Sequence, residues 1–589
     1  MLRKQAVIYN TLYEPQKRFV DELIDKRGAL KPRDEAFKWG FFLKMGFGKT
    51  KIMTAMAELH EADLILITTE KSKMLERDNE GEFPAELAAA GYKTFYSDKM
   101  GSKKYEREFL DALNKGEKIV YMFNWAQINA KKGYSILNWI VGGLDSLKAP
   151  DRRRWLEDEY NKSDKTLTFD EFINNKGPQY KNIVWIMDEA HAVNNKSARL
   201  SKTVNGMLYN KNVPGLQITR SNYFRERIKA VYLGTGTPMT GKYYENYYWL
   251  LTILGHRWGE TPLEVNLYEE QARLVIDANS GRQTSELVEK CIGKGVPPAI
   301  PTVNRYNKRT YRVETRKLSA YEYFVNRYCV INEETKMYDP DALNIIGFKR
   351  IPELLDIVEH YAFFGETAKH FELPSVMTEI KWVAPGVGYK RLFDKKSPHY
   401  LRFEDKELTS AAEIYLRSRQ ALSGFMGNSE HYVFYSEERS LQLRDFLMRE
   451  RSNYIIFYHW DPELYAIVDA VQQAGYNYDI YKGDLKEYEV YKNYEKGEGN
   501  VVIANIASGA KALNRQKWNS VLFYSLPSVY ALYEQAIGRV LRLGQTAERV
   551  FVGIFLAKGT VDEYIYNNLI NGRDYTEQAF ARDFLDQTK

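Results

Sequence analysis

The stretch Phe41–Thr50, "FFLKMGFGKT", places two glycines, a lysine and a threonine directly after a run of apolar residues. Glycines let backbone N–H groups approach an anionic oxygen, the lysine neutralises phosphate charge, and the threonine hydroxyl can ligate Mg²⁺. The pattern predicts a strand that ends at Leu43, a phosphate-binding loop, and a helix from Thr50 to about His60. The strict form of such a loop begins with glycine, where this chain has Leu43. The loop alone therefore does not decide the function, and the motifs that accompany it must be found elsewhere in the chain.

The bulk composition is that of an ordinary soluble chain with several domains. A length of 589 residues exceeds what one hydrophobic core holds, and 44% hydrophobic and 28% charged residues are typical of globular proteins. No signal-like N-terminus and no window of eighteen uncharged apolar residues is found, so no membrane partner is expected. The two cysteines, Cys291 and Cys329, fit neither a disulfide framework nor a zinc site. A cytoplasmic location is expected, which means the host cytoplasm if a virus encodes the chain. The net charge of +6 permits an anionic partner without requiring one.

Short apolar runs bounded by turn residues alternate with helical patterns in both halves of the chain. This alternation predicts parallel sheets with crossover helices, which bind ligands at the carboxyl ends of their strands. In the first half, the further predicted strands are Asp63–Thr69, Lys118–Phe123, Asn182–Glu189 and Lys229–Pro238. In the second half, they are Asn453–Trp460, Tyr478–Gly483, Asn500–Ile506, Ser520–Pro527 and Arg549–Leu556.

We therefore predict an α/β fold with two parallel-sheet lobes, the first over residues 1–258 and the second over residues 429–589. The region between them, residues 259–428, is mixed and charged, and we predict that it is mostly helical. Within it, Glu353–Phe364, "ELLDIVEHYAFF", has the pattern of a helix.

Two acidic residues follow another predicted strand, in "IVWIMDEAH". Asp188, together with Thr50, is predicted to hold Mg²⁺, and Glu189 is predicted to orient and deprotonate an attacking water. A plain acidic turn is the alternative, which the upstream Lys49 makes less attractive. His191 has two interpretations, contact with the next motif or a structural role.

Three further stretches carry side chains suited to a nucleotide. "LGTGTP" places Thr235 and Thr237 at the end of a predicted strand, where hydroxyls could relay the state of the phosphates, although such residues are often plain turn residues. Gln16 offers a donor and an acceptor, the pair needed to read an adenine edge. "QAIGRVLRLGQ", Gln535–Gln545, places Arg539 and Arg542 on one face of a helix. That face either stabilises γ-phosphate charge from the second lobe, which requires the lobes to close, or is a solvated basic surface.

Taken in order, these motifs resemble those of superfamily 2 helicases with a DEAD/DEAH box, and within them the Swi/Snf-like ATPases. "MGFGKT" looks like that group's M-G-L-G-K-T, and "DEAHAVNNKSARLSK" resembles its D-E-A-H-x-x-K-N-x-x-S-x-L. "RVETRKLSAYEYFVNRY" is similar to the segment that opens its inter-lobe region, and "RVLRLGQTAERVFVGIFLAKGTVDEYI" looks like its R-x-x-R-I-G-Q ending. The resemblance covers both lobes. The chain as a whole is similar to the stand-alone motors encoded in bacterial and phage genomes.

The resemblance implies two RecA-like lobes that use ATP and Mg²⁺ to move along DNA. It implies double-stranded DNA as the favoured partner, gripped through its backbone without regard to sequence; protein partners are not indicated. The implied nucleotide-binding residues are Gln16, Met45, Gly46, Phe47, Gly48, Lys49, Thr50, Gly509 and Gln535. The implied catalytic residues are Lys49, Asp188, Glu189, Arg539 and Arg542, with Thr50 and Asp188 at the metal.

Part of this resemblance departs from the group's pattern. "ANIASGAKALN", Ala504–Asn514, is similar to the segment that joins ATP to the DNA strand, but it carries Ala510 and Lys511 where glycines are usual. Two other functions remain open: an RNA helicase of the same superfamily, and a nucleic-acid-binding scaffold with a silent ATPase. The complete set of five catalytic residues argues against the scaffold, because a silent motor has no chemical need for all of them.

Overall fold

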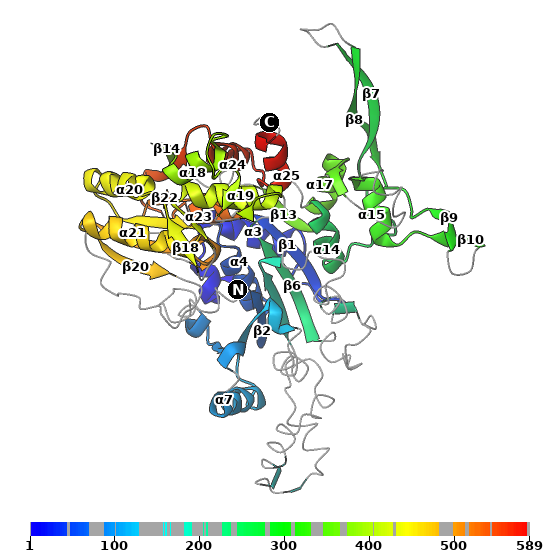
Figure 1. Ribbon diagram of the computed structural model, residues 1–589. Helices are drawn as coiled ribbons and strands as arrows, with labels where there is room; N and C mark the ends of the chain where they lie inside the picture. Colours follow the sequence, from blue (N-terminus) through cyan, green and yellow to red (C-terminus); the bar gives the residue numbers. More distant parts are fainter. Residues whose placement is uncertain are drawn as a thin grey trace. The chain divides into compact units, whose positions relative to one another are not determined.

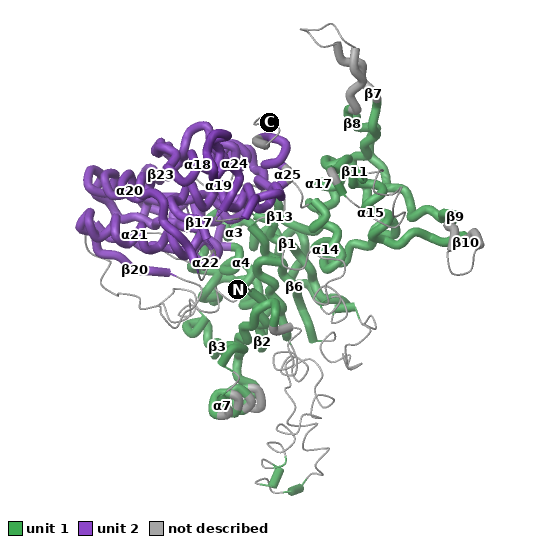
Figure 2. The backbone as a smooth tube through the Cα atoms, viewed as in Figure 1, with its two compact units in different colours: residues 1–44, 49–74, 82–366 green, residues 45–48, 75–81, 367–589 purple. Residues whose placement is uncertain are grey.

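The structure is a computed structural model that describes most of the chain. The described residues are 2–43, 47–69, 87–99, 102–128, 182–190, 227–236, 244–276, 283–307, 312–331, 345–365, 374–403, 406–427, 431–481, 499–512, 518–541 and 545–585, with isolated positions at 157, 160–161, 165–166, 204 and 208–209. The chain divides into two compact units (Figure 2). Unit 1 comprises residues 1–44, 49–74 and 82–366, and unit 2 comprises residues 45–48, 75–81 and 367–589.

A seven-stranded sheet forms the centre of unit 1 (Figure 1). Every neighbouring pair of its strands is parallel, as the alternation of apolar runs and helical patterns predicts. Strands β2, β4 and β5 are buried along their whole length, because both faces of the sheet are covered. In spatial order the strands are β13 (Ala362–Gly365), β1 (Phe37–Leu43), β6 (Ile228–Thr235), β5 (Ile183–Asp188), β2 (Leu64–Thr69), β4 (Ile119–Asn124) and β3 (Lys93–Tyr96).

Helices pack on both faces of this sheet. Helix α4 (Lys49–Leu59) begins shortly after β1 and packs against β5 and β6, with most of its residues buried. On the other face, Tyr247 of α14 (Asn246–Ile253) contacts Phe42 of β1, with ring centroids 5.9 Å apart. Among the described residues up to 128, the other helices are α1 (Leu2–Gln5), α2 (Val7–Asn10), α3 (Glu14–Asp25), η2 (Ser97–Lys99), α7 (Lys103–Asn114) and α8 (Trp125–Ile128).

The segment predicted as one helix over Glu353–Phe364 is a helix followed by a strand. Helix α17 (Ile351–Glu359) ends before a turn, and β13 then pairs in parallel with β1 at the edge of the sheet. The prediction of a continuous helix is wrong because the apolar period continues through the turn. Gly40 of β1 lies opposite Ala362, and a Cβ atom at residue 40 would lie only 2.7 Å from the Ala362 Cβ. The missing side chain on β1 therefore makes room for β13.

The region 259–428 is not mostly helical, and its described residues contain more strand than helix. Two antiparallel hairpins extend from the body of unit 1 (Figure 1). The elements of this region within unit 1 are β7 (Val265–Ile276), β8 (Gln283–Gly295), β9 (Thr302–Asn307), β10 (Arg312–Lys317), α15 (Ala320–Tyr328), β11 (Cys329–Ile331), β12 (Ile345–Phe348), α17 and β13.

A buried ion pair joins α15 to α17. Glu353 is fully buried and accepts hydrogen bonds from Arg327 Nε at 2.6 Å and Nη2 at 2.8 Å, and from the Tyr328 hydroxyl at 2.9 Å. It also accepts from the Tyr268 backbone N–H at 3.3 Å, which ties the β7–β8 hairpin to α17. Removing one member of such a network leaves a buried charge without its partner.

Substituting Glu353 by alanine is expected to destabilise unit 1 by about 3–5 kcal/mol, because Arg327 would keep a charge in a buried site. The measurement is the shift in the midpoint of urea-induced unfolding relative to the unsubstituted chain. Glu108→Ala is the control, since Glu108 forms an ion pair with Lys93 in which both side chains are about half exposed. That change is expected to cost less than about 1 kcal/mol. Equal shifts for the two variants would contradict the assignment.

Unit 2 contains a second parallel sheet, of six strands. All its neighbouring pairs are parallel, so the prediction of two parallel sheets is confirmed. In spatial order the strands are β14 (Ser375–Val383), β23 (Arg549–Ala557), β22 (Ser520–Phe523), β19 (Tyr454–Tyr458), β21 (Asn500–Asn505) and β20 (Asn477–Tyr481). The five strands predicted in the second half are all present, and β14 adds an edge strand that was not predicted.

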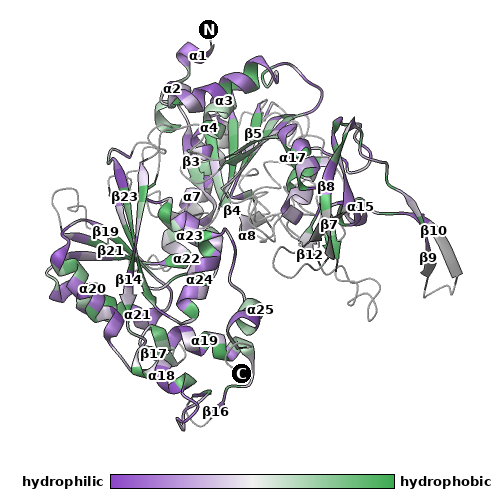
Figure 3. Ribbon diagram, turned by 90° about the horizontal axis from the view of Figure 1, so that it is seen from above, coloured by the Kyte–Doolittle hydropathy of each residue, from purple (hydrophilic) through white to green (hydrophobic). Residues whose placement is uncertain are grey.

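Two apolar clusters cover the two faces of this sheet. One includes Leu443 and Ile467, from the helices on one face, and the other includes Tyr533 and Ile565, from those on the opposite face. The helices carry hydrophobic and hydrophilic residues together, as expected of helices with one buried side (Figure 3). They are α18 (Val387–Phe393), α19 (Ala411–Leu422), α20 (Glu438–Arg449), α21 (Asp461–Gln473), α22 (Ile506–Ala512), α23 (Tyr530–Ile537), α24 (Val561–Ile570), α25 (Glu577–Phe580) and η8 (Ala581–Leu585). Two small hairpins pair β15 (Arg402–Phe403) with β16 (Lys406–Glu407), and β17 (Phe425–Gly427) with β18 (Tyr432–Phe434).

Within the residues that the structure describes, no helix is long and apolar enough to cross a membrane.

Candidate functional site

The site of unit 1 lies at the carboxyl ends of β1, β5 and β6. These strands are parallel neighbours, so the residues that follow them meet at one edge of the sheet. Gly48 has a φ of 72°, a left-handed conformation that glycine adopts without strain, and α4 begins at the next residue. Met45 and Gly46 of the predicted loop lie outside the described residues.

Lys49 is the first residue of α4, and its side chain is buried. Its Nζ donates a hydrogen bond to the backbone oxygen of Leu43 at 2.8 Å, so the lysine reaches back to the end of β1. This contact holds the ammonium group at the base of the loop. A cation in this place can neutralise phosphate oxygens that the loop would bind.

Thr50 and Asp188 meet in the structure, although 138 residues separate them in the sequence. The Thr50 hydroxyl donates to Asp188 Oδ2 at 2.9 Å, and the buried carboxylate accepts the Glu189 backbone N–H on Oδ1 at 3.0 Å. Neighbouring ligands of an octahedral Mg²⁺ ion, with bonds of about 2.0–2.1 Å, lie about 2.9 Å apart. The two oxygens predicted to hold Mg²⁺ therefore have a spacing that fits this ion.

No group of three or more His, Cys, Asp or Glu side chains able to hold a metal occurs among the described residues.

Glu189 lies directly after β5 in a left-handed conformation, with a φ of 51°. A residue with a Cβ atom adopts this conformation at a cost of roughly 1–3 kcal/mol, and such residues gather at functional sites. The side chain is buried, with 3% of its surface exposed. Glu189 is thus a buried carboxylic residue in a left-handed conformation directly after Asp188, and its role toward an attacking water stays a prediction.

Two residues that the sequence analysis did not identify position Asp188. Trp125, at the start of α8 after β4, donates its indole N–H to the Asp188 backbone oxygen at 3.0 Å. Gly234 of β6 lies opposite Asp188, and a Cβ atom there would lie 2.6 Å from Met53 Cε and 3.4 Å from Asp188 Oδ1. The first glycine of "LGTGTP" therefore makes room within the strand. A tryptophan directly after a strand was the available signal for Trp125.

Three other predicted residues have different outcomes. Thr235 is fully buried at the end of β6, whereas Thr237 and His191 lie outside the described residues. Gln16 is buried near the start of α3, and its Oε1 accepts the Tyr13 backbone N–H at 2.9 Å. That bond is local to the beginning of the helix, and an adenine contact of Gln16 stays a prediction.

The predicted residues of the second lobe belong to unit 2. Gln535 is buried in α23, and Gly509 is buried in α22. Arg539 is 2% exposed and lies beyond the end of α23, so the prediction that it projects from a helix face is wrong; the helix ends at Ile537, with Gly538 as its C-cap. Arg542, Leu513 and Asn514 lie outside the described residues. Delivery of Arg539 and Arg542 to a nucleotide of unit 1 stays a prediction.

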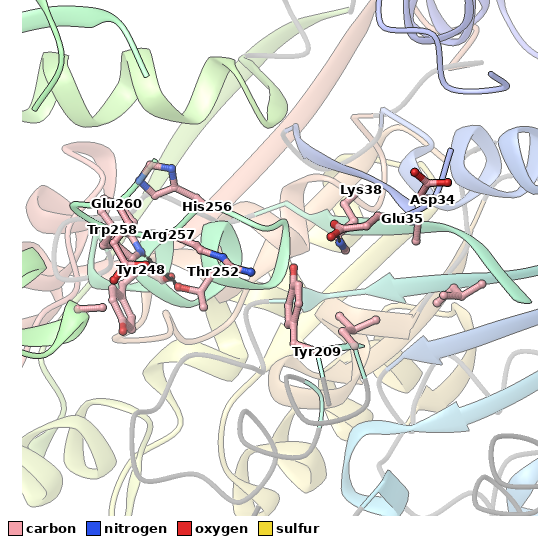
Figure 4. A pocket seen from close by; sticks show the side chains of 14 residues that line it. Asp34, Glu35, Lys38, Tyr209, Tyr248, Thr252, His256, Arg257, Trp258 and Glu260 are labelled. Atoms are coloured by element: carbon pink, nitrogen blue, oxygen red, sulfur yellow. Dashed lines mark hydrogen bonds and ion pairs between the residues drawn. The ribbon is translucent and has the colours of Figure 1, made fainter. Parts of the chain in front are cut away.

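A cavity of about 650 Å³ lies at the opposite, amino-terminal end of the strands of unit 1 (Figure 4). Ala36 and Lys38 from the beginning of β1 and Ile228 from the beginning of β6 contribute to its lining. The Lys38 Nζ lies 4.8 Å from the centre of the Tyr209 ring, and burial lowers the pKa of this lysine. The cavity therefore does not coincide with the site at Lys49 and Asp188.

The charges and polar groups around this cavity are mixed. Lys38 lies 3.8 Å from Glu35, and Arg257 and Glu260 line the wall at the other end (Figure 4). Burial lowers the pKa of His256 to about 4, so this residue is neutral near pH 7. Because both signs of charge occur around the wall, its electrostatics favour neither an anionic nor a cationic ligand.

Comparison with known proteins gives one family. Residues 438–544, which run from the start of α20 to beyond α23, match the helicase conserved C-terminal domain. No curated protein matches the chain. The matched segment contains the central strands β19, β21 and β22 and the edge strand β20 of the second parallel sheet, together with Gly509, Gln535 and Arg539.

The matched segment contains the motif residues of the second half of the chain and does not extend to those of the first half. The site at Lys49, Thr50, Asp188 and Glu189 is thus supported by its own geometry, independently of the family match. The match over residues 438–544 supports a superfamily 1 or superfamily 2 helicase, and helicases of this family generally act on nucleic acid and use ATP with Mg²⁺.

Proposed function

We propose that this chain is an ATP-dependent DNA translocase of the Swi/Snf-like group, with double-stranded DNA as its favoured track. The observation that carries the proposal is the hydrogen bond between Thr50 and Asp188. It unites the two halves of a nucleotide site in unit 1, while unit 2 supplies the helicase C-terminal domain. The sequence resemblance to stand-alone bacterial and phage motors supports the narrower assignment, with a cytoplasmic location.

Each of the four site residues of unit 1 has a chemical role in this proposal. Lys49 neutralises β- and γ-phosphate oxygens, and Thr50 with Asp188 holds Mg²⁺, which when bound offsets the charge that develops on the phosphates. Glu189 orients the attacking water and takes its proton. Removal of the loop contact to Leu43 would release the Lys49 ammonium group toward a bound phosphate.

The second unit completes the reaction in the same proposal. Arg539 and Arg542 stabilise the charge that spreads over the γ-phosphate, and they do so only when the two units close on one nucleotide. Gly509 and Gln535 contact the nucleotide from the same side, and Gln16 reads the adenine. Repeated closing and opening, coupled to hydrolysis, is what moves the chain along its track.

In this proposal the chain binds the DNA duplex through its phosphates. Backbone amides, hydroxyls and helix N-termini contact the phosphate oxygens without reading bases, which suits a motor that must step over every sequence. Binding is therefore expected to weaken steeply as salt is raised, because each phosphate contact releases bound counterions.

The test of this function is steady-state ATP hydrolysis without nucleic acid and with single-stranded DNA, double-stranded DNA or RNA. Stimulation chiefly by double-stranded DNA supports the translocase, and displacement of a third strand from a DNA triplex then tests movement directly. Stimulation chiefly by RNA would assign the chain to the RNA helicases of the same superfamily. Absence of hydrolysis under all four conditions would favour a scaffold with a silent ATPase.

A further inference from the structure

A small basic hollow occurs in unit 2, away from the predicted nucleotide residues. It has a volume of about 50 Å³, and its rim carries three exposed side chains, Arg391, His399 and Arg402. Arg391 belongs to α18 and Arg402 to β15, so two elements contribute to the lining of one hollow. The other lining residues are Gly388, Leu392, Phe403, Met426 and Tyr435. We name this hollow the α18–β15 site.

No acidic side chain is among the described residues that line the α18–β15 site, although Glu407 of β16 lies opposite Arg402 in the register of the hairpin. Between residues 390 and 402 the sequence has five lysines and arginines and one acidic residue, Asp394. Among the described residues, neither Arg391 nor Arg402 forms an ion pair, in contrast to Lys406, which lies 2.6 Å from Glu413. Glu404 and Asp405 follow in the sequence and lie outside the described residues. Two guanidinium groups without a described acidic partner thus border one hollow.

The backbone holds this rim in a fixed shape. Leu401, directly before Arg402, has a φ of 49°, the left-handed conformation that side-chain-bearing residues rarely adopt. Its N–H donates to the Leu392 backbone oxygen at 2.9 Å, and its own carbonyl accepts from the Leu408 N–H at 2.8 Å. The first bond ties the residue before β15 to the end of α18, and the second ties it to the residue after β16. The positions of Arg391 and Arg402 relative to one another are therefore set by the fold.

The floor of the hollow is also closely packed. The guanidinium of Arg417 lies 4.2 Å from the centre of the Phe403 ring, and it donates to the Gly427 backbone oxygen at 2.6 Å. Gly388 faces Tyr435, and a Cβ atom at residue 388 would lie 3.1 Å from the Tyr435 Cβ. Ligand pockets for drug-sized molecules measure roughly 300–1,000 Å³, so this hollow has room for one small anionic group and excludes a base or a nucleoside.

We propose that the α18–β15 site binds one backbone phosphate of the nucleic-acid strand on which the chain acts. The proposal rests on the function proposed above. Arginine guanidinium groups bind phosphate oxygens through paired N–H donors, and a contact of this kind carries no sequence information. The exposed rim lets a phosphate that remains part of a strand enter without desolvating the bases. The site lies before residue 438, so it extends the nucleic-acid surface beyond the matched helicase domain.

The experiment compares nucleic-acid binding by the Arg391→Gln/Arg402→Gln double variant with binding by the unsubstituted chain, over a range of salt concentrations. The expected result is at least a tenfold loss of affinity for duplex DNA near 0.1 M salt. The slope of log K against log salt should also fall by about 0.9 in magnitude, since the site holds one phosphate and each phosphate contact contributes about 0.9. ATP hydrolysis without nucleic acid should not change, because neither arginine belongs to the nucleotide site.

The matched control is Arg444→Gln/Arg449→Gln on α20, which removes the same charge from the same unit. Both arginines bond to Asp445, through its side chain for Arg444 and through its backbone oxygen for Arg449, and neither lines the hollow. This control is expected to change affinity less than twofold and to leave the salt slope unchanged. Equal losses in the two double variants would overturn the proposal, since only general charge would then matter.

Two further arms separate the possible sources of phosphate. In calorimetric titration with inorganic phosphate, binding by the unsubstituted chain that the double variant loses, combined with unchanged nucleic-acid affinity, would overturn the strand assignment and leave a site for a free phosphate. A comparison of DNA and RNA duplexes then shows which strand is held, and a loss on either supports the proposal. If the unsubstituted chain binds no nucleic acid at all, the proposed function itself fails, a result distinct from equal losses in the two variants.

Discussion

Substituting Lys49 by alanine is expected to reduce ATP hydrolysis at least 100-fold under the best-stimulated condition. The ammonium group lies at the base of the loop, where Lys49 Nζ donates to the Leu43 backbone oxygen at 2.8 Å. It carries the positive charge at the first residue of α4. Removing one preorganised donor to transition-state charge typically lowers kcat by about 10²–10³, and a charged donor lies toward the upper end. The measurement is the rate of phosphate release at saturating ATP.

Lys51→Ala is the matched control for this variant. Lys51 lies two residues further along α4, so its removal changes the charge of the same helix by the same amount. Its hydrolysis should stay within about twofold of the unsubstituted chain, and thermal unfolding of both variants should show that the fold is kept. If Lys49→Ala retained more than half of the activity, ATP would not be hydrolysed at this loop, and the proposed site would be wrong.

The parallel strands could be predicted because their burial is recorded in the sequence itself. Strand β5 is buried at every position and is therefore apolar until Asp188, where the chain reaches the edge of the sheet. The change from apolar to acidic residues marks both the end of the strand and the beginning of the site. The same argument located β2, β4, β6 and the central strands of unit 2.

Edge elements were harder to predict because partners distant in the sequence decide them. The strand β13 follows α17 after a turn of only two residues, His360 and Tyr361, and its pairing depends on the missing side chain of Gly40. The strand β14 is exposed along most of its length and pairs with β23, which lies about 170 residues further along the chain. A local pattern does not contain either fact.

Some side-chain contacts in the site could likewise be predicted from the sequence, and others could not. The meeting of Thr50 and Asp188 could be predicted because both residues carry the chemistry that Mg²⁺ requires. The bond from Trp125 to the Asp188 backbone oxygen has no such signature, since any residue offers that acceptor. The bond between Gln16 and the Tyr13 N–H shows the converse, because a side chain suited to adenine also suits the start of a helix.

Substituting Glu189 by glutamine is expected to lower ATP hydrolysis by about 10²–10⁴-fold, the usual contribution of a general base, while ATP binding is kept. Glutamine has nearly the size and shape of glutamate, and it can occupy the buried position after β5 without the charge. It cannot accept the proton of the attacking water. Single-turnover hydrolysis and binding of a fluorescent ATP analogue measure the two effects separately.

The control for this variant must reproduce its backbone as well as its chemistry. Glu61 is also a glutamate with positive φ, 53° against 51° for Glu189, but it lies in a turn after α4 at the opposite end of the strands. Glu61→Gln therefore carries the same change in the same conformation without the site, and its hydrolysis should equal that of the unsubstituted chain. A Glu189→Gln variant that hydrolysed ATP normally would remove Glu189 as the base, and one that lost ATP binding as well would show that its carboxylate instead holds the site together. Only loss of hydrolysis with ATP binding intact identifies Glu189 as the base that deprotonates the attacking water.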